Sequence, residues 1–237
     1  MTQRQFETTI DWTDFWEDAN EDRRTKTAPA AQFTLDPLRS FVETKGAPGS
    51  VADVGCGPGT VPFVMAEQFP AATVVGYDAA EPVLAENRDR AEREGHANLA
   101  FEQTVLPSFD PDRSFDLVTC FYTLMYVEEI EAALAALYDA VAPGGHLVVT
   151  YHNRYAHRHF RTMAEDPHEH LGPESPWDPN NFEDRFELLI EGENLLSHER
   201  IHEILGTWPQ SIWSVAGEDE RYEAWRYNPM VYVPKTV

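Results

Sequence analysis

Short apolar runs alternate with amphipathic stretches between residues 51 and 151. The runs lie at 51–54, 73–77, 99–103, 115–121 and 147–151. Each is too short for a typical helix and apolar enough for a strand that is covered on both faces. Between them, apolar residues at helical spacing predict helices, as over 82–93, where a proline begins the helix and a glycine follows it. Alternating strands and helices predict a parallel sheet with right-handed crossovers, and so an α/β fold.

The residues before this alternation predict two helices. Trp12, Phe15 and Trp16 fall on one face of a helix that Asp11 is placed to cap. A second helix is expected over 36–44. This aromatic face suits packing on the core as well as it suits covering a ligand.

After residue 151 the alternation stops. The run at 186–190 fits either a strand or the edge of a helix, and Ser197 is placed to cap a short helix that ends before Gly206. The run 230–233 lies between prolines, which predicts a last strand at or near a sheet edge.

We therefore divide the chain into an N-terminal helical cap (1–49) and a larger domain (50–237). The larger domain has a core (50–151) and an elaboration (152–237) that we expect on the substrate side.

A glycine-rich turn follows the first predicted strand. In Asp53-Val-Gly-Cys-Gly-Pro-Gly59, glycines stand at every second position before a helix that begins near Thr60. Glycine lets a backbone turn sharply and approach a ligand closely, and the free N–H groups of the helix start face that ligand. A dinucleotide-binding fingerprint needs its third glycine at position 60, where this chain has threonine.

This turn resembles motif I of the class I S-adenosylmethionine-dependent methyltransferases. The resemblance extends to Asp78 after the second strand, to 114–118 at the fourth strand and to 143–147 before the fifth. It implies a Rossmann-like three-layer sandwich on a doubly wound, mostly parallel seven-stranded sheet, with the last strand antiparallel. It also implies S-adenosylmethionine as the cofactor.

The resemblance further implies which residues contact the cofactor. Asp78 is the expected ribose acid, because a carboxylate accepts from both hydroxyls. Many members carry an acid for the adenine amine where this chain has Gln103 and Thr104. The full expected set is Asp53, Gly55, Cys56, Gly57, Asp78, Ala79, Gln103, Thr104 and Phe121.

The fourth strand ends in Cys120-Phe-Tyr-Thr-Leu124, without the acid or Asn and the Pro-Pro-aromatic sequence of members that methylate amides or exocyclic amines. We therefore expect a small-molecule acceptor with a nucleophilic O, N or C atom. Tyr122, Tyr126 and Tyr151 are candidates for its pocket, although core packing explains them equally well. His152, directly after the fifth strand, is a candidate general base.

Charge and composition indicate the salt environment, the kinds of partner and the location to expect for the protein. The 237 residues carry a net charge of -23, and only 3 of the 18 basic residues are lysine. Acid excess with scarce lysine resembles salt-adapted proteins, and no basic stripe serves a nucleic acid backbone. No apolar run is long enough to cross a membrane and the N-terminus lacks a signal-peptide core, so we expect a cytoplasmic protein.

The remaining chemistry is sparse. Cys56 and Cys120 form no CxxC pair, and the late histidines, such as His157 and His159, lack a diagnostic metal spacing, so no metal is expected. The alternative to an enzyme is a catalytically silent cofactor-binding protein that acts by interaction. The sequence leaves the oligomeric state and the identity of the acceptor open.

Overall fold

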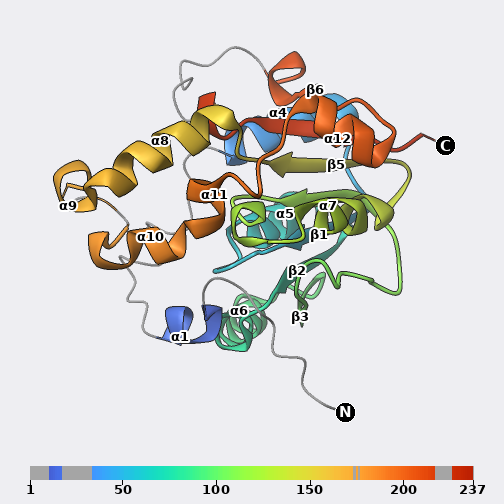
Figure 1. Cartoon of the computed structure of the whole chain (residues 1–237). Coiled ribbons are helices and arrows are strands. Elements are labelled where there is room, and N and C mark those ends of the chain that lie inside the picture. Colours follow the sequence, from blue (N-terminus) through green and yellow to red (C-terminus); the bar gives the residue numbers. More distant parts are fainter. Residues whose placement is uncertain (1–10, 18–33, 173–174, 176, 217–225, 237) are drawn as a thin grey trace.

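The structure is a computed structural model that describes residues 11–17, 34–172, 175, 177–216 and 226–236. Its centre is one seven-stranded sheet in the order β3-β2-β1-β4-β5-β7-β6 (Figure 1). The strands are β1 (Ser50–Val54), β2 (Thr73–Asp78), β3 (Leu99–Gln103), β4 (Phe115–Cys120), β5 (Val141–Thr150), β6 (Gln210–Ser211) and β7 (Met230–Pro234).

Strands β1 to β5 are parallel, and β7 lies antiparallel to both β5 and β6. The predicted doubly wound sheet with an antiparallel last strand is therefore confirmed. β5 begins at Val141, six residues before the start we predicted. Its first residues include Pro143-Gly144-Gly145, and the register with β4 shifts in this segment. Prolines and glycines mask a strand in a pattern read from the sequence alone.

Helices cover both faces of the sheet, as the three-layer prediction requires. On one face lie α4 (Leu35–Lys45), α5 (Thr60–Gln68) and α6 (Glu81–Glu94). Leu38, Phe41 and Val42 of α4 are buried against this face, so the second half of the predicted cap region packs on the sheet itself. The predicted start of α6 at a proline and its end at Gly95 are confirmed.

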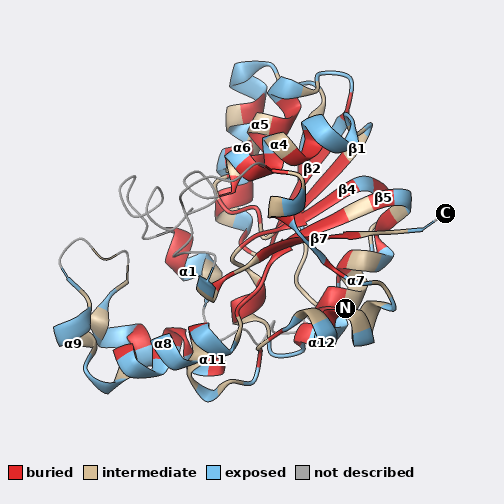
Figure 2. Ribbon diagram, turned by 90° about the horizontal axis from the view of Figure 1, so that it is seen from above, coloured by how far each residue is buried: buried red, intermediate tan, exposed pale blue. Residues whose placement is uncertain are grey.

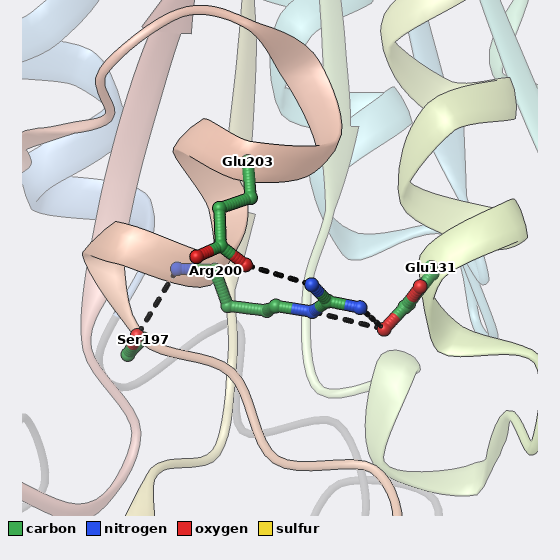
Figure 3. A network of polar contacts seen from close by, with 4 residues as sticks. All are labelled: Glu131, Ser197, Arg200 and Glu203. Atoms are coloured by element: carbon green, nitrogen blue, oxygen red, sulfur yellow. Dashed lines mark hydrogen bonds and ion pairs between the residues drawn. The ribbon is translucent and has the colours of Figure 1, made fainter.

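The other face carries α7 (Ile130–Asp139) and α12 (His198–Leu205). Ser197 caps α12 as predicted, because its Oγ accepts from the Arg200 N–H at 3.1 Å. Arg200 also joins the two helices: its Nε donates to Glu131 of α7 at 2.9 Å, and its Nη1 donates to Glu203 at 2.7 Å (Figure 3). These groups are exposed, so the network contributes little free energy beyond fixing how α12 lies on α7.

Most of the elaboration forms a separate helical layer beyond the carboxyl ends of the strands (Figure 2). Its elements are α8 (Arg154–Glu165), α9 (Pro167–His170), η2 (Pro179–Asn181), α10 (Phe182–Arg185) and α11 (Glu187–Glu191). Their aromatic and aliphatic side chains form a cluster with Met125 of η1 (Leu124–Tyr126), the short helix that follows β4. The run 186–190, for which strand and helix were both open, lies almost entirely in α11.

The first predicted helix is α1 (Trp12–Glu17), which is capped by Asp11: Oδ1 accepts from the N–H groups of Thr13 and Asp14. In Figures 1 and 2, α1 lies between α6 and the α8–α11 layer. Phe15 and Trp16 are buried in this position. None of the helices in the described parts of the chain has the length and apolar character to cross a membrane.

Candidate functional site

The glycine turn joins β1 to α5 at the carboxyl edge of the sheet. The N–H groups of Gly55 and Cys56 both donate to the carbonyl of Tyr77 in β2, at 2.8 and 2.9 Å. Gly55, Gly57 and Gly59 all have positive φ, at 77°, 48° and 76°. A Cβ on Gly55 would lie 2.0 Å from Oγ1 of Thr123. The turn therefore requires glycine both for its backbone conformation and for its close packing.

Asp78, the predicted ribose acid, lies directly beside this turn. Its Oδ2 accepts from the N–H of Gly57 at 2.8 Å and its Oδ1 accepts from the N–H of Ala80 at 3.0 Å. Burial raises the pKa of this carboxyl, and the backbone N–H groups oppose that rise. Asn87 of α6 supports the arrangement by donating from Nδ2 to the Gly57 carbonyl at 2.7 Å.

Asp53 lies at the end of β1, in the core beneath the turn. The hydroxyl of Thr119 donates to its Oδ1 at 2.6 Å, and the side chain is almost fully buried. Burial raises the pKa of Asp53 to about 7; the Thr119 bond opposes this rise and the Asp78 charge adds to it. This carboxyl is thus poised to change its charge near neutral pH.

The remaining residues predicted to contact the cofactor surround the same edge. The Gln103 amide donates from Nε2 to the Ala79 carbonyl at 2.8 Å, which leaves its amide oxygen as an acceptor. The Thr104 N–H donates to the Asp78 carbonyl at 2.9 Å. Cys56 and Phe121 are buried core residues, and burial raises the pKa of the Cys56 thiol.

The three substrate-side tyrosines lie in three different surroundings. Tyr126 packs against the α8–α11 layer, while the Tyr122 ring packs toward the α4 and α5 face. Tyr122 also has a positive φ of 55°, and its N–H donates to Oγ1 of Thr150 at 2.8 Å. Tyr151 belongs to the core beneath α7 and α12, with its hydroxyl 3.0 Å from Nδ1 of His198. The structure therefore does not gather them around one point.

His152 is buried, and its ring lies edge-on to Phe160 of α8, with 6.1 Å between centroids. Burial lowers its pKa to about 4, so the imidazole is neutral at pH 7. Of the later histidines, His157 has Nδ1 2.9 Å from the Leu189 carbonyl and His159 stacks on Tyr227. The described residues contain no group of three or more His, Cys, Asp or Glu side chains placed to hold a metal.

One part of the site was left open by the sequence, and another was missed. A Cβ on Gly57 would lie 3.2 Å from a ring carbon of Trp16, so α1 lies directly over the glycine turn. Arg185 of α10 is buried, and its Nε and Nη2 both donate to the Tyr126 hydroxyl at 3.3 Å. For the aromatic face of Trp12, Phe15 and Trp16 the sequence left two roles open, packing on the core and covering a ligand. No local pattern distinguishes Arg185 from the other arginines.

Known proteins resemble this chain in sequence and in fold. A family model described as "Methyltransferase domain" matches residues 47–203. A demethylmenaquinone methyltransferase of Thermus thermophilus is 39% identical over 103 residues, which are 44% of this chain and 47% of that protein. A trans-aconitate 2-methyltransferase of Variovorax paradoxus is 34% identical over 145 residues, which are 59% and 51% of the two chains. The chain thus spans about half the length of the curated relatives it matches.

Two crystal structures show the same fold across nearly the whole chain. Magnesium protoporphyrin IX methyltransferase from Synechocystis, with bound SAH, has a TM-score of 0.58 at 18% identity and covers 95% of this chain and 93% of its own. The plantazolicin methyltransferase BamL, in complex with an analogue of desmethylPZN and SAH, has a TM-score of 0.63 at 14% identity and covers 95% of both. At these identities the likeness concerns the fold alone.

Proposed function

Because this chain belongs to the methyltransferase domain family, we propose that it transfers the methyl group of S-adenosylmethionine to a nucleophilic O, N or C atom of a small molecule. The observation that carries the proposal is the pairing of Asp78 with the glycine turn. The names of the relatives specify different acceptors, trans-aconitate and demethylmenaquinone, so they do not choose between acceptors for this chain.

The residues at the turn fit the proposed cofactor. Each Asp78 oxygen accepts at least one backbone N–H, and a carboxylate has about four acceptor positions, so the pair has room for a ribose hydroxyl as well. The amide oxygen of Gln103 suits a hydrogen bond from the adenine amine. Asp53 supplies a carboxylate on the same edge, where a cationic group of the cofactor would favour its ionised form. Ala79, Cys56, Thr104 and Phe121 complete the proposed contacts.

When bound, the cofactor supplies a sulfonium-activated methyl group, so the protein's task is alignment and exclusion of water. Trp16 and Phe15 of α1 cover the turn, and the α8–α11 layer faces them. Of the three tyrosines, we propose Tyr126 for the acceptor side, because it contacts both α1 and Arg185; for Tyr122 and Tyr151 the same role rests on the sequence alone.

We also propose His152 as the general base. Its neutral imidazole is able to accept a proton at pH 7, and it lies two residues after Thr150, the last residue of β5. Its low pKa makes it a weak base, so it would serve an acceptor whose proton is itself acidic or is lost as the methyl group arrives.

Two wider proposals rest on composition. The net charge of -23 and the 3 lysines among 18 basic residues support adaptation to high salt, and the sequence supports a cytoplasmic protein that acts on small molecules rather than on nucleic acid.

We retain the division at residue 50 into a cap and a methyltransferase domain with a substrate-side elaboration. The position of α1 over the turn supports a covering role for the first part of the cap.

Calorimetry with S-adenosylhomocysteine tests the cofactor assignment. Asp78→Asn should weaken binding at least about tenfold, because a hydrogen bond to a charged group contributes about 1.5–3 kcal/mol. The matched control is Asp89→Asn on the exposed face of α6, which should bind as the wild type does. Equal affinity for wild type and Asp78→Asn would refute the assignment, as would tighter binding of NAD.

Turnover is tested separately by incubating the protein and S-adenosylmethionine with a broad metabolite extract and measuring S-adenosylhomocysteine. Formation of S-adenosylhomocysteine that depends on the extract supports the enzyme. Tight cofactor binding without any transfer would favour the silent binding protein instead.

A further inference from the structure

Arg185 is a buried cation for which the described residues provide no anionic partner. Its side chain is 7% exposed, and its only hydrogen bonds among those residues go to one neutral hydroxyl, that of Tyr126. A guanidinium carries five N–H donors, and burying a charge without a counter-ion is costly. Both bonds are 3.3 Å long, beyond the usual range for N–H donors.

The contrast with other arginines of the chain is sharp. Arg88, Arg90 and Arg200 are far more exposed, and each forms an ion pair with a glutamate. Acidic residues outnumber basic ones by 41 to 18, so a carboxylate partner is easy to provide in this chain. The neighbours of Arg185 in the sequence, Glu183, Asp184 and Glu187, are exposed and form no ion pair with it.

Aromatic rings surround the guanidinium instead of carboxylates. Its carbon lies 4.9 Å from the ring centre of Phe15, 5.5 Å from that of Phe186 and 5.8 Å from that of Tyr126. Cation–π contacts stabilise the charge in part and keep water away from it. Such surroundings strengthen any ion pair that forms there, because its attraction is little screened.

The position of Arg185 connects it to the cofactor side. Phe15, which contacts Arg185, is next to Trp16, which lies over Gly57 of the glycine turn. Trp12 of the same helix lies edge-on to Tyr126, with 4.8 Å between centroids. Tyr126 in turn belongs to η1, which follows β4 at the carboxyl edge of the sheet. Arg185 therefore lies among the groups proposed to meet the acceptor.

We propose that Arg185 is a specificity-determining residue that binds a carboxylate of the methyl acceptor. This inference rests on the proposed function and adds the chemical class of its substrate: a small carboxylic acid with an apolar or planar body. The planar guanidinium pairs with both oxygens of a carboxylate, Tyr126 orients the guanidinium, and the aromatic rings contact the body of the acid. Arg185 thereby positions the acceptor and takes no part in the transfer of the methyl group.

The test uses the full chain saturated with S-adenosylhomocysteine, at one fixed KCl concentration. Small carboxylic acids and their primary amides, including benzoate with benzamide and succinate with succinamide, are titrated and followed by ligand-observed NMR. We expect at least one acid to bind at least about tenfold more tightly than its amide, the factor for one hydrogen bond to a charged group. No preference for the acid in any pair would overturn the proposal without the use of any variant.

Variants then assign the preference to Arg185. Arg185→Met keeps a long apolar side chain and should abolish the preference for acids, while Arg185→Lys keeps the charge and should retain part of it. Arg161→Met, on the exposed side of α8, is the matched control and should behave as the wild type does. A preference for acids that survives Arg185→Met would also overturn the proposal.

The two proposals fail in different ways. Calorimetry with S-adenosylhomocysteine on each variant shows whether the fold and the cofactor site are intact, because neither Arg185 nor Arg161 belongs to the proposed cofactor contacts. Failure of the wild type to bind S-adenosylhomocysteine would refute the proposed function. Cofactor binding by the wild type without a preference for acids would refute only the role of Arg185.

Discussion

Asp53 should make the stability of the protein depend on pH between about 4 and 7. Burial raises its pKa from the ordinary 3.8 to about 7. The folded chain therefore holds this proton more tightly than the unfolded chain does. The contribution of Asp53 to stability is greatest below pH 3.8 and is lost as the pH rises through about 7. The difference between the two pKa values corresponds to a contribution of about 4 kcal/mol to the free energy of unfolding. About 2–3 kcal/mol of that contribution is lost between pH 5 and pH 8.

The variant Asp53→Asn removes the pH-dependent contribution of Asp53 to the free energy of unfolding. Asparagine keeps an oxygen that accepts from the Thr119 hydroxyl but never ionises. Urea unfolding of the ligand-free protein at pH 5 and pH 8, at constant KCl, gives the free energy of unfolding for the wild type and the variant. Relative to the wild type, Asp53→Asn should become more stable by about 2–3 kcal/mol on going from pH 5 to pH 8.

The difference between variant and wild type is the informative quantity, because the acidic residues other than Asp53, 40 of the 41, titrate in both. Asp89→Asn on the exposed face of α6 controls for the loss of one carboxylate and should show no such change with pH. A constant difference between Asp53→Asn and the wild type at both pH values would refute the argument that burial governs Asp53.

Three further outcomes follow from the structure and the composition. Gly55→Ala should lower the free energy of unfolding by about 2–5 kcal/mol, because the positive φ and the overpacking against Thr123 act together. Gly95→Ala, at the same φ of 77° with no atom within 4 Å of the added Cβ, should cost only about 1 kcal/mol. Equal costs for the two variants in urea unfolding would contradict this. The melting temperature should rise as KCl goes from low to molar concentration, through screening of the net charge of -23; a flat or falling series would indicate an ordinary acidic protein. His152→Ala should lower turnover about 10²–10⁴-fold at unchanged affinity for S-adenosylhomocysteine. Protonation of the imidazole should lower the wild-type rate only below about pH 5. Unchanged turnover of the variant would remove His152 from the mechanism.

The sheet and the cofactor side could be predicted because their determinants are local in sequence. Strands β1 to β4 follow from apolar runs within single segments, and the turn follows from Gly55, Gly57 and Gly59, whose positive φ values need no distant partner. Asp78 was found because the carboxyl ends of neighbouring parallel strands meet at one edge. The start of β5 was wrong, and α11 was ambiguous, since a five-residue apolar run fits either strand or helix.

The acceptor side depends instead on contacts between segments that are far apart in the chain. Arg185 reaches Tyr126 across 59 residues, and Phe15 comes to it from the opposite end of the sequence. α1 has six residues, too few to be stable alone, so its place over Gly57 and Arg185 is set by the aromatic contacts it makes there. The periodicity of apolar residues along the chain does not predict such an arrangement. The cofactor half of the site is therefore encoded in the backbone of one turn, whereas specificity for the acceptor lies in side chains that only the folded chain brings together.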